Sequence, residues 1–406
     1  MDQEIRPFLY EALGRDRIRL IRLEPDSFTR PAGFDIQTFE IARTPEYYAL
    51  SYCWGIPDRI DFVLCNGARL SVTPHLKAGL GELLIVPRLL HQWFWIDQIC
   101  INQDDLDEQS RQVQLMTQIY AGASCTVLWL ASNFAADGED YIRASEFASH
   151  IYETGQNHEM LSFEPILQKS KLRPGGWSGR LPAARALRTP DDLDRWGLPP
   201  LTDCRWGALC DVFAAPWFSR VWVIREVFAS RDEPIVVGRG RCHGFLHLLW
   251  AGYFMSQNFQ LLRQSEHINT PSVAEANLSH TRLLLQLAIG KMEWTLEGIL
   301  WRTVTYGATK PVDKFFAVVD LTLSPRSGVD PLPAAIVPDY SKSLADVGRD
   351  FTRHVVETKQ SRRKKTLKAE MIDPCLATFI HGCKSTSTAA ARDSPLRRLS
   401  LSPPTS

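Results

Sequence analysis

The chain has 406 residues, and its 46 lysine and arginine residues balance its 46 aspartate and glutamate residues. This length is sufficient for two domains, or for one domain with an extension. Because there is no net charge, no basic field favours nucleic acid, and we expect no nucleic-acid partner.

Cysteine usage and the apolar windows indicate the compartment. The nine cysteines are scattered and form no C-x-x-C pair, which is typical of reduced thiols in the cytosol or nucleus. The N-terminus is charged and lacks a long apolar core, so no signal peptide is predicted. Pro87, Arg88 and His91 interrupt the most apolar windows. We therefore expect a cytoplasmic protein without a membrane span.

The first part of the chain is predicted to form strands. Apolar alternation indicates a half-buried strand over residues 17–23, and residues 34–41 and 47–53 are two further strand candidates. The pair Asn66-Gly67 predicts a type I′ turn inside a hairpin over residues 62–72. A helix follows over residues 74–84.

The next segment has the pattern of a β-α-β unit. Residues 93–100 form a near-continuous apolar run, typical of a strand buried on both faces, with one acid, Asp97, inside it. An amphipathic helix over residues 108–122 and a second apolar strand over residues 125–130 follow. We expect the two strands to be adjacent and parallel. Polar residues at the carboxyl ends of parallel strands are where ligands usually bind.

The remainder is predicted to be mainly helical. Helices are expected over residues 131–163, 206–213, 220–230, 281–301 and 311–321. A short strand is expected over residues 234–237. Residues 170–200 are rich in Gly, Pro and Arg and indicate an exposed insertion. Beyond residue 358 the chain becomes polar and Ser-rich, which predicts a disordered tail.

Asp97 allows two interpretations. At the end of a buried strand, its side chain can contact a ligand or a neighbouring loop. Alternatively, it is a structural acid that accepts backbone N–H groups from residues 102–105.

Glu226 also allows two interpretations. It follows Trp222 by four residues, which places both on one helical face. A tryptophan beside a carboxylate suits nucleoside stacking and ribose binding. Alternatively, Trp222 belongs to the core and Glu226 pairs with Arg220 or Arg225.

Three blocks of sequence carry a family resemblance. They are YYALSYCWG at residues 47–55, WIDQICINQ at 95–103 and PWFSRVWVIRE at 216–226, with a weaker match in DKFFA at 313–317 and PDYSKS at 338–343. The chain resembles the heterokaryon-incompatibility (HET) domain family of filamentous fungi over roughly residues 18–351. This resemblance implies a role in fungal non-self recognition and regulated cell death.

The HET domain in turn looks like a remote relative of the Toll/interleukin-1 receptor (TIR) domain. The comparable segments are Leu50-Ser51-Tyr52, Trp95-Ile96-Asp97 and residues 219–226. The resemblance implies an α/β fold with a TIR-like (flavodoxin-like), mostly parallel sheet, flanking helices and a helical C-terminal region. We expect a HET domain over residues 1–231 with its core at about 45–231, a mainly helical extension over 232–357 and a disordered tail over 358–406.

The TIR resemblance also implies a site. In TIR enzymes the last block contains the catalytic glutamate of NAD glycohydrolysis, which here falls on Glu226. The candidate substrate-binding residues are Ser51, Tyr52, Trp54, Asp97 and Trp222. Residues from the three blocks are expected to line one cleft at the carboxyl edge of the sheet. NAD would be the substrate, and no metal or resident cofactor is predicted.

One residue departs from the family pattern, which usually has glutamine before this glutamate. Arg225 occupies that position, where a cation would pair with Glu226 or point to solvent. Because a fold alone does not determine activity, two alternatives to an enzyme stay open. They are a non-enzymatic, self-associating signalling module and a degenerate family member without activity. Self-association and an unidentified upstream protein partner are the interactions that we expect.

Three further patterns favour ordinary structure over function. The glycines at positions 238, 240 and 244 are spaced one residue too widely for a dinucleotide loop, and a strand-to-helix turn is expected there. His243 and His247 form an i, i+4 pair without a third ligand at a usual spacing, which argues against a zinc site. The run Arg362-Arg363-Lys364-Lys365 is read as a solvated charge run rather than a nuclear-localisation signal.

Overall fold

The computed structural model describes residues 5–23, 33–130, 139–157, 168–169, 177–178, 187–269, 271–289, 295–322 and 332–365. Its strands are β1 (Arg17–Leu23), β2 (Gly33–Glu40), β3 (Tyr47–Tyr52), β4 (Asp61–Cys65), β5 (Ala68–Val72), β6 (Trp93–Trp95), β7 (Thr126–Trp129), β8 (Gln168–Lys169), β9 (Trp177–Ser178), β10 (Ile235–Gly238) and β11 (Arg241–Gly244). Its α-helices are α1 (Pro74–Leu84), α2 (Asp97–Cys100), α3 (Leu106–Gly122), α4 (Glu139–Asn157), α5 (Asp191–Arg195), α6 (Arg205–Phe213), α7 (Trp222–Ala229), α8 (Phe245–Leu262), α9 (Pro271–Ile289), α10 (Leu296–Arg302), α11 (Asp313–Phe316) and α12 (Leu344–Lys365).

One mixed sheet of nine strands organises the molecule, in the order β11-β10-β7-β3-β6-β1-β2-β4-β5. Strands β10, β7, β3 and β6 are contiguous and parallel. Antiparallel strands β11 and β1 flank this parallel group. The predicted α/β class is confirmed, but the sheet is mixed rather than mostly parallel.

The predicted adjacency of the two apolar strands is wrong. β6 and β7 are parallel and lie in one sheet, but β3 lies between them and pairs with both. Almost every residue of β3 is buried, and a strand buried on both faces belongs inside a sheet. The local pattern of a β-α-β unit does not show that an earlier strand takes the place between its two strands.

The strand predicted over residues 93–100 is also shorter than expected. β6 ends at Trp95, and α2 begins at Asp97. The turn is closed by the Cys100 N–H, which donates to the Ile96 carbonyl at 2.7 Å. Asp97 therefore follows the strand instead of lying inside it, which avoids burying an acid between strands.

The hairpin predicted from the Asn-Gly pair is confirmed. β4 and β5 are antiparallel, and Asn66 and Gly67 have φ angles of 51° and 74°. The Asn66 side chain also extends the sheet, because it bonds both the N–H and the carbonyl of Ile36 at 2.9 Å. Local turn chemistry is therefore sufficient to set this register.

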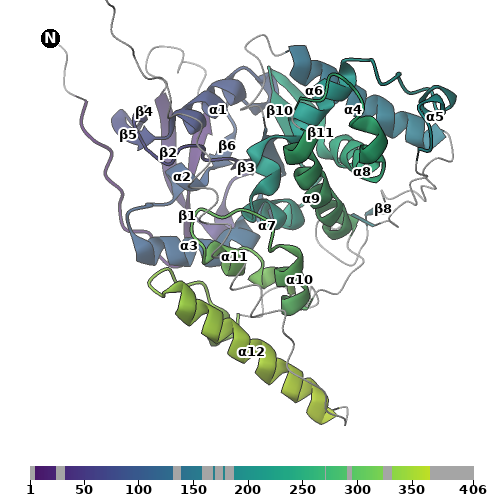
Figure 1. Cartoon of the computed structure of the whole chain (residues 1–406). Coiled ribbons are helices and arrows are strands. Elements are labelled where there is room, and N and C mark those ends of the chain that lie inside the picture. Colours follow the sequence, from purple (N-terminus) through teal and green to yellow (C-terminus); the bar gives the residue numbers. More distant parts are fainter. Residues whose placement is uncertain are drawn as a thin grey trace, which may run out of the picture.

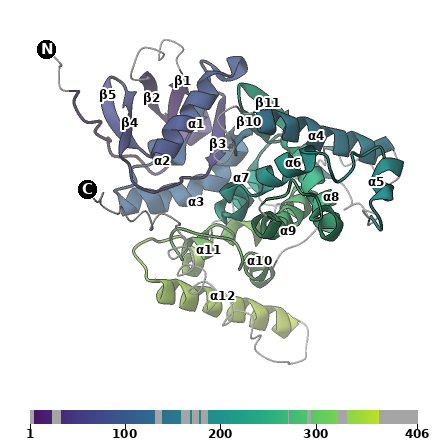
Figure 2. The ribbon, with the colours of Figure 1, turned by 45° about the horizontal axis from the view of Figure 1, so that its top comes forward.

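Two clusters of buried apolar side chains form the core. One unites the sheet with α1, α2 and α3, and it includes Leu20, Phe94 and Ile119. The other unites α4, α6, α8, α9 and the C-terminal elements, and it includes Phe213 and Trp250. The sheet with α1–α3 occupies one side of the molecule and the helices α4, α6, α8 and α9 the other, with α7 between them (Figures 1 and 2).

The sheet continues past residue 231, where the HET domain was expected to end. β10 pairs in parallel with β7, and β11 completes a hairpin with β10. The segment predicted to be mainly helical therefore starts with two strands of the same sheet. It also contains α8, which the sequence pattern did not indicate because this helix is buried on nearly all sides and lacks a one-sided apolar stripe.

The predicted tail begins too early. α12 continues to Lys365 (Figure 1), so residues 358–365 are helical; the rest of the predicted tail lies outside the described residues. Lysine, arginine and glutamine favour helices, and Lys359 Nζ lies 2.6 Å from the Glu297 carboxylate. Of the insertion expected to be exposed over 170–200, residues 170–176 and 179–186 lie outside the described residues. Leu187, Leu193 and Leu198 in the remainder are buried, so the segment is not exposed throughout.

The glycine pattern near residue 240 forms a hairpin turn between β10 and β11, not the expected strand-to-helix turn. Arg239 and Gly240 both have positive φ angles, as a tight hairpin requires. His243 lies on β11 and His247 on α8, so they are not an i, i+4 pair on one helix. Over the described ranges, no helix has the length and apolarity needed to cross a bilayer.

Candidate functional site

β3 and α7 meet at the carboxyl edge of the parallel strands. Ser51, next to the end of β3, donates its hydroxyl proton to Oε2 of Glu226 on α7. Trp217, in the 3₁₀ turn η5 (Pro216–Ser219), donates its indole N–H to the Ser51 hydroxyl at 2.8 Å. The first and third sequence blocks are therefore joined through one serine side chain.

The second block joins the same edge through Asp97. Its Oδ2 accepts the indole N–H of Trp54 at 2.8 Å, and its Oδ1 accepts the backbone N–H of Gln98 at 2.7 Å. The buried Tyr52 side chain lies beside this carboxylate. Burial raises the pKa of Tyr52, and the nearby Asp97 carboxylate raises it further.

Arg220 lies near both carboxylates. Its guanidinium donates to the Tyr52 carbonyl and lies close enough to Glu226 and Asp97 to lower the pKa of both carboxyl groups. We call Ser51, Tyr52, Trp54, Asp97, Arg220 and Glu226 the carboxylate cluster. The convergence expected of the three blocks is thus present, but as a compact cluster and not as an open cleft.

Burial and the neighbouring positive charge have opposite effects on the pKa values of the two carboxyl groups in this cluster. Burial raises the pKa of Glu226 to about 7, while Arg220 and the Ser51 hydroxyl act to lower it. Burial likewise raises the pKa of Asp97, against the effects of Arg220 and Trp54. A carboxyl group that titrates near neutrality is suited to proton transfer and to electrostatic stabilisation at physiological pH.

Glu108, not Asp97, is the structural acid of the loop after α2. Its carboxylate accepts the Asn102 N–H at 2.7 Å and forms a buried ion pair with Arg19 at 2.6 Å. The alternative role of Asp97 as the acceptor for this loop is therefore wrong, because the Asp97 carboxylate bonds Trp54 and Gln98 instead.

Trp222 and Arg225 turn away from the cluster. The Arg225 guanidinium lies 5.2 Å from the Trp222 ring centroid, and Trp222 hydrogen-bonds the Asp313 carboxyl group. Arg225 is fully buried and donates to the carbonyls of Val113 and Ala317 at 3.0 and 3.2 Å. Arg225 does not reach solvent and forms no hydrogen bond with Glu226, but its charge acts to lower the pKa of that carboxyl group, as one of the two alternatives implied. Successive helical residues point about 100° apart, which separates their partners.

A match to a known protein family covers the residues of this cluster. Residues 47–226 match the model of the heterokaryon incompatibility protein (HET) family. This segment is a HET domain. It begins at the first residue of β3 and ends at Glu226, so the HET domain contains the whole carboxylate cluster. The predicted HET resemblance is confirmed, whereas the relation to TIR domains stays a prediction.

A curated relative supports the HET assignment. The chain is similar to heterokaryon incompatibility protein 6, OR allele, of Neurospora crassa, with 30% identity over 241 residues. The alignment covers 54% of this chain and 33% of the relative, so the chain spans about a third of the relative's length. No solved structure matches the chain.

Two residues near Ser51 and Glu226 were not among the predicted site residues. Trp217 supplies a hydrogen bond to Ser51, and the charge of Arg220 acts on the pKa of both carboxyl groups. Both belong to the third block, PWFSRVWVIRE, whose length indicated only the family. Its polar and aromatic positions were the signal that would have indicated them.

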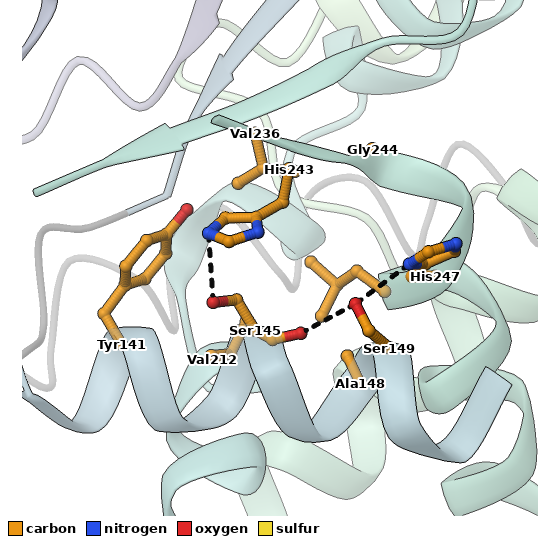
Figure 3. Close-up of a pocket in the computed structure, with 10 residues that line it drawn as sticks. Tyr141, Ser145, Ala148, Ser149, Val212, Val236, His243, Gly244 and His247 are labelled. Atoms are coloured by element: carbon orange, nitrogen blue, oxygen red, sulfur yellow. Dashed lines mark hydrogen bonds between the residues drawn. The ribbon is translucent and has the colours of Figure 1, made fainter. Parts of the chain in front are cut away.

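A separate pocket lies outside the carboxylate cluster, between α4 and the β11–α8 connection (Figure 3). His243 Nε2 lies 3.2 Å from Ser145 Oγ, and His247 Nδ1 lies 2.9 Å from Ser149 Oγ. Each serine hydroxyl donates to a carbonyl of α4, Ser145 to Ile142 and Ser149 to Ser145. The imidazoles therefore act as donors, and neither serine is activated as a nucleophile. Across the part of the chain that the structure describes, no three or more His, Cys, Asp or Glu side chains are grouped to hold a metal ion.

Proposed function

We propose that this chain acts in fungal heterokaryon incompatibility and that its HET domain cleaves NAD through Glu226. The observation that carries the proposal is the contact between Ser51 and Glu226, which joins the ends of the HET domain around a carboxyl group that titrates near neutrality. The name of the Neurospora crassa relative, a heterokaryon incompatibility protein, supports the biological role.

The chemistry assigned to Glu226 is hydrolysis of the N-glycosidic bond of NAD. The bond between C1′ of the ribose and the nicotinamide nitrogen breaks, and its electron pair neutralises the pyridinium. Water then forms the new C1′–O bond and releases one proton, giving ADP-ribose and nicotinamide. The Glu226 carboxylate binds the ribose hydroxyls and stabilises the positive charge that develops on the ribose ring.

Access to Glu226 requires a rearrangement of the cluster. Ser51 and Glu226 are 1% and 3% exposed, whereas Trp54, Asp97 and Arg220 are half-buried. The half-buried residues form the rim through which a nucleotide would reach the carboxylate. We propose that self-association opens this rim, so that a dilute monomer is inactive and clustered protein is active.

The role is tested by expression in a filamentous fungus, with cell death and the cellular NAD pool as readouts. Wild-type protein is expected to kill cells and to deplete NAD, and Glu226→Gln is expected to do neither. Glu153→Gln, on the exposed face of α4, is the matched control and should behave as wild type. Equal killing and equal NAD loss by Glu226→Gln would refute the catalytic assignment.

A second candidate is a non-enzymatic module that signals by self-association. The enclosure of Glu226 favours it, and so do two exposed apolar side chains in the segment after Trp54. Ile56 and Ile60 are 70% and 76% exposed, and exposed apolar side chains that lie close together often contact a partner. Under this candidate, cell death persists in Glu226→Gln without NAD loss, and a combined Ile56→Ser, Ile60→Ser variant abolishes it.

A further inference from the structure

The chemistry of Trp217 fixes the direction of the hydrogen bonds around Ser51. An indole N–H can only donate, so the Ser51 oxygen accepts at the 2.8 Å contact. A serine hydroxyl has one proton, and that proton remains for Oε2 of Glu226. The result is a directed chain from Trp217 through Ser51 to Glu226.

Each member of this chain is held by a different element. Trp217 is 1% exposed and packs edge-on against Phe218 and Phe245, with ring centroids 5.1 and 5.6 Å apart. Ser51 pairs with β7 inside the parallel strands. The main-chain carbonyl of Glu226 accepts the Thr126 hydroxyl at 3.2 Å. Three anchored elements therefore set the orientation of one carboxylate oxygen.

We propose that Trp217 and Ser51 are positioning residues for Glu226: they hold Oε2 and thereby present Oε1 to the ribose hydroxyls of a nicotinamide dinucleotide. The inference rests on the proposed NAD cleavage. It changes the role expected for Ser51, from a residue that contacts substrate to one that acts through the carboxylate. It also assigns Trp217 a function beyond its packing.

The hydrogen bonds from Trp217 through Ser51 to Glu226 should have a measurable effect on the pKa of Glu226. A hydroxyl that donates to a carboxylate stabilises the ionised form, so the Ser51 hydroxyl lowers the pKa of Glu226 against the effect of burial. Removing the hydroxyl should raise that pKa by about 1–2 pH units, since a hydrogen bond to a charged group typically has this effect. Removing only the indole N–H should raise it less, because the serine hydroxyl remains but is free to rotate.

The test uses five variants of the full-length protein. Ser51→Ala removes the hydroxyl, Ser51→Thr keeps it, and Trp217→Phe removes the N–H while keeping an aromatic ring. Trp206→Phe is the matched control, because Trp206 is also fully buried and its N–H bonds the Pro199 carbonyl away from the cluster. The Glu226 carboxyl is titrated by NMR with carboxyl-labelled glutamate and is assigned with Glu226→Gln. Nicotinamide release by clustered protein is measured over the same pH range.

The expected result is a higher Glu226 pKa in Ser51→Ala and Trp217→Phe, with the acidic limb of the rate profile moved by the same amount. Ser51→Thr and Trp206→Phe should keep the wild-type value. An unchanged titration in Ser51→Ala, with wild-type melting behaviour, would overturn the inference. The two measurements separate the two proposals. A shifted Glu226 titration without nicotinamide release by clustered wild-type protein rejects NAD cleavage. Nicotinamide release with an unshifted Glu226 titration in Ser51→Ala rejects the positioning role of Trp217 and Ser51.

Discussion

At the scale of single residues, the carboxylate cluster combines features that a purely structural site would avoid. The charge of Arg220 acts on two acids, Asp97 and Glu226, and burial raises the pKa of both acids. Replacing such groups with apolar residues of similar size is often neutral or stabilising. Their presence at the carboxyl edge of parallel strands is therefore better explained by a function than by stability.

Glu226 should make stability depend on pH in a defined direction. Its pKa is about 7 in the folded protein against an ordinary 4.5, so the folded state binds more protons across this window. The contribution of Glu226 is fully present below pH 4.5 and is lost as pH rises to 7. Glu226→Gln mimics the protonated form, so its stability relative to wild type should rise by about 3 kcal/mol across the window. Urea unfolding at several pH values measures this, and a difference independent of pH would contradict it.

Arg225 should be far more costly to replace than an exposed arginine. It is fully buried, bonds the carbonyls of Val113 and Ala317 and lies 3.5 Å from Asp320. Arg225→Gln leaves Asp320 without its cation and should destabilise the protein by about 3–5 kcal/mol. Arg195→Gln, whose side chain is 73% exposed, is the control and should leave the melting temperature unchanged. Equal melting temperatures for the two variants would show that the Arg225 contacts contribute nothing.

At the scale of elements, the sequence predicted the hairpin and the helix that depend on local turn residues and local apolar periodicity. The Asn66-Gly67 turn specified the β4–β5 hairpin, and the amphipathic pattern specified α3 to within two residues at its N-terminus. The strand containing Asp97 was predicted too long, because the apolar run continues through Ile99 into a buried helix. Apolar runs do not distinguish a buried strand from a buried helical turn.

Two glycines provide a matched test of how backbone conformation affects stability. An added Cβ would meet nothing within 4 Å at Gly67 or at Gly81. Gly67 has a φ of +74°, so Gly67→Ala should cost about 1–2 kcal/mol. Gly81 lies inside α1, so Gly81→Ala should stabilise the protein by up to about 1 kcal/mol. Thermal unfolding decides the signs, and a shared sign would mean that backbone conformation does not control either position.

At the scale of the whole molecule, the order of strands could not be predicted from the sequence. β3 lies between β6 and β7, and β10 extends the sheet after some hundred residues of chain beyond β7. These positions depend on contacts between distant segments, which periodicity does not encode. The same holds for Trp217 and Arg220, whose partners lie more than 160 positions away. The family blocks nevertheless carry information that spacing lacks: they led to Ser51, Asp97 and Glu226, which the structure places at one edge of the sheet, while their role as a site stays a prediction.

The C-terminal helix should be part of the cooperative fold, and the residues after it should not. Val347 and Phe351 are 2% and 1% exposed, and Phe351 packs on Phe315 with ring centroids 5.0 Å apart. A chain ending at Lys365 should therefore melt as the full chain does, since the remaining segment is polar. A chain ending before Leu344 lacks Val347 and Phe351 and exposes the apolar surface that they cover. Its free energy of unfolding should fall by several kcal/mol, at about 1.5–3 kcal/mol for each buried apolar side chain that is removed. Loss of the cooperative transition in the chain that ends at Lys365 would show that the residues after Lys365 contribute to the core.

The most direct test of the central claim is nicotinamide release from NAD by purified protein, dilute and clustered through a fused dimerisation module. Glu226→Gln keeps the size of the side chain and removes its charge, and loss of one positioned electrostatic partner typically lowers a rate by about 100- to 1,000-fold. We predict release by clustered wild-type protein and by Glu153→Gln, and at least a roughly 100-fold slower rate for Glu226→Gln with a melting temperature no lower than that of wild type. No release by clustered wild-type protein, or equal release by Glu226→Gln, would contradict the assignment of Glu226 as the catalytic residue.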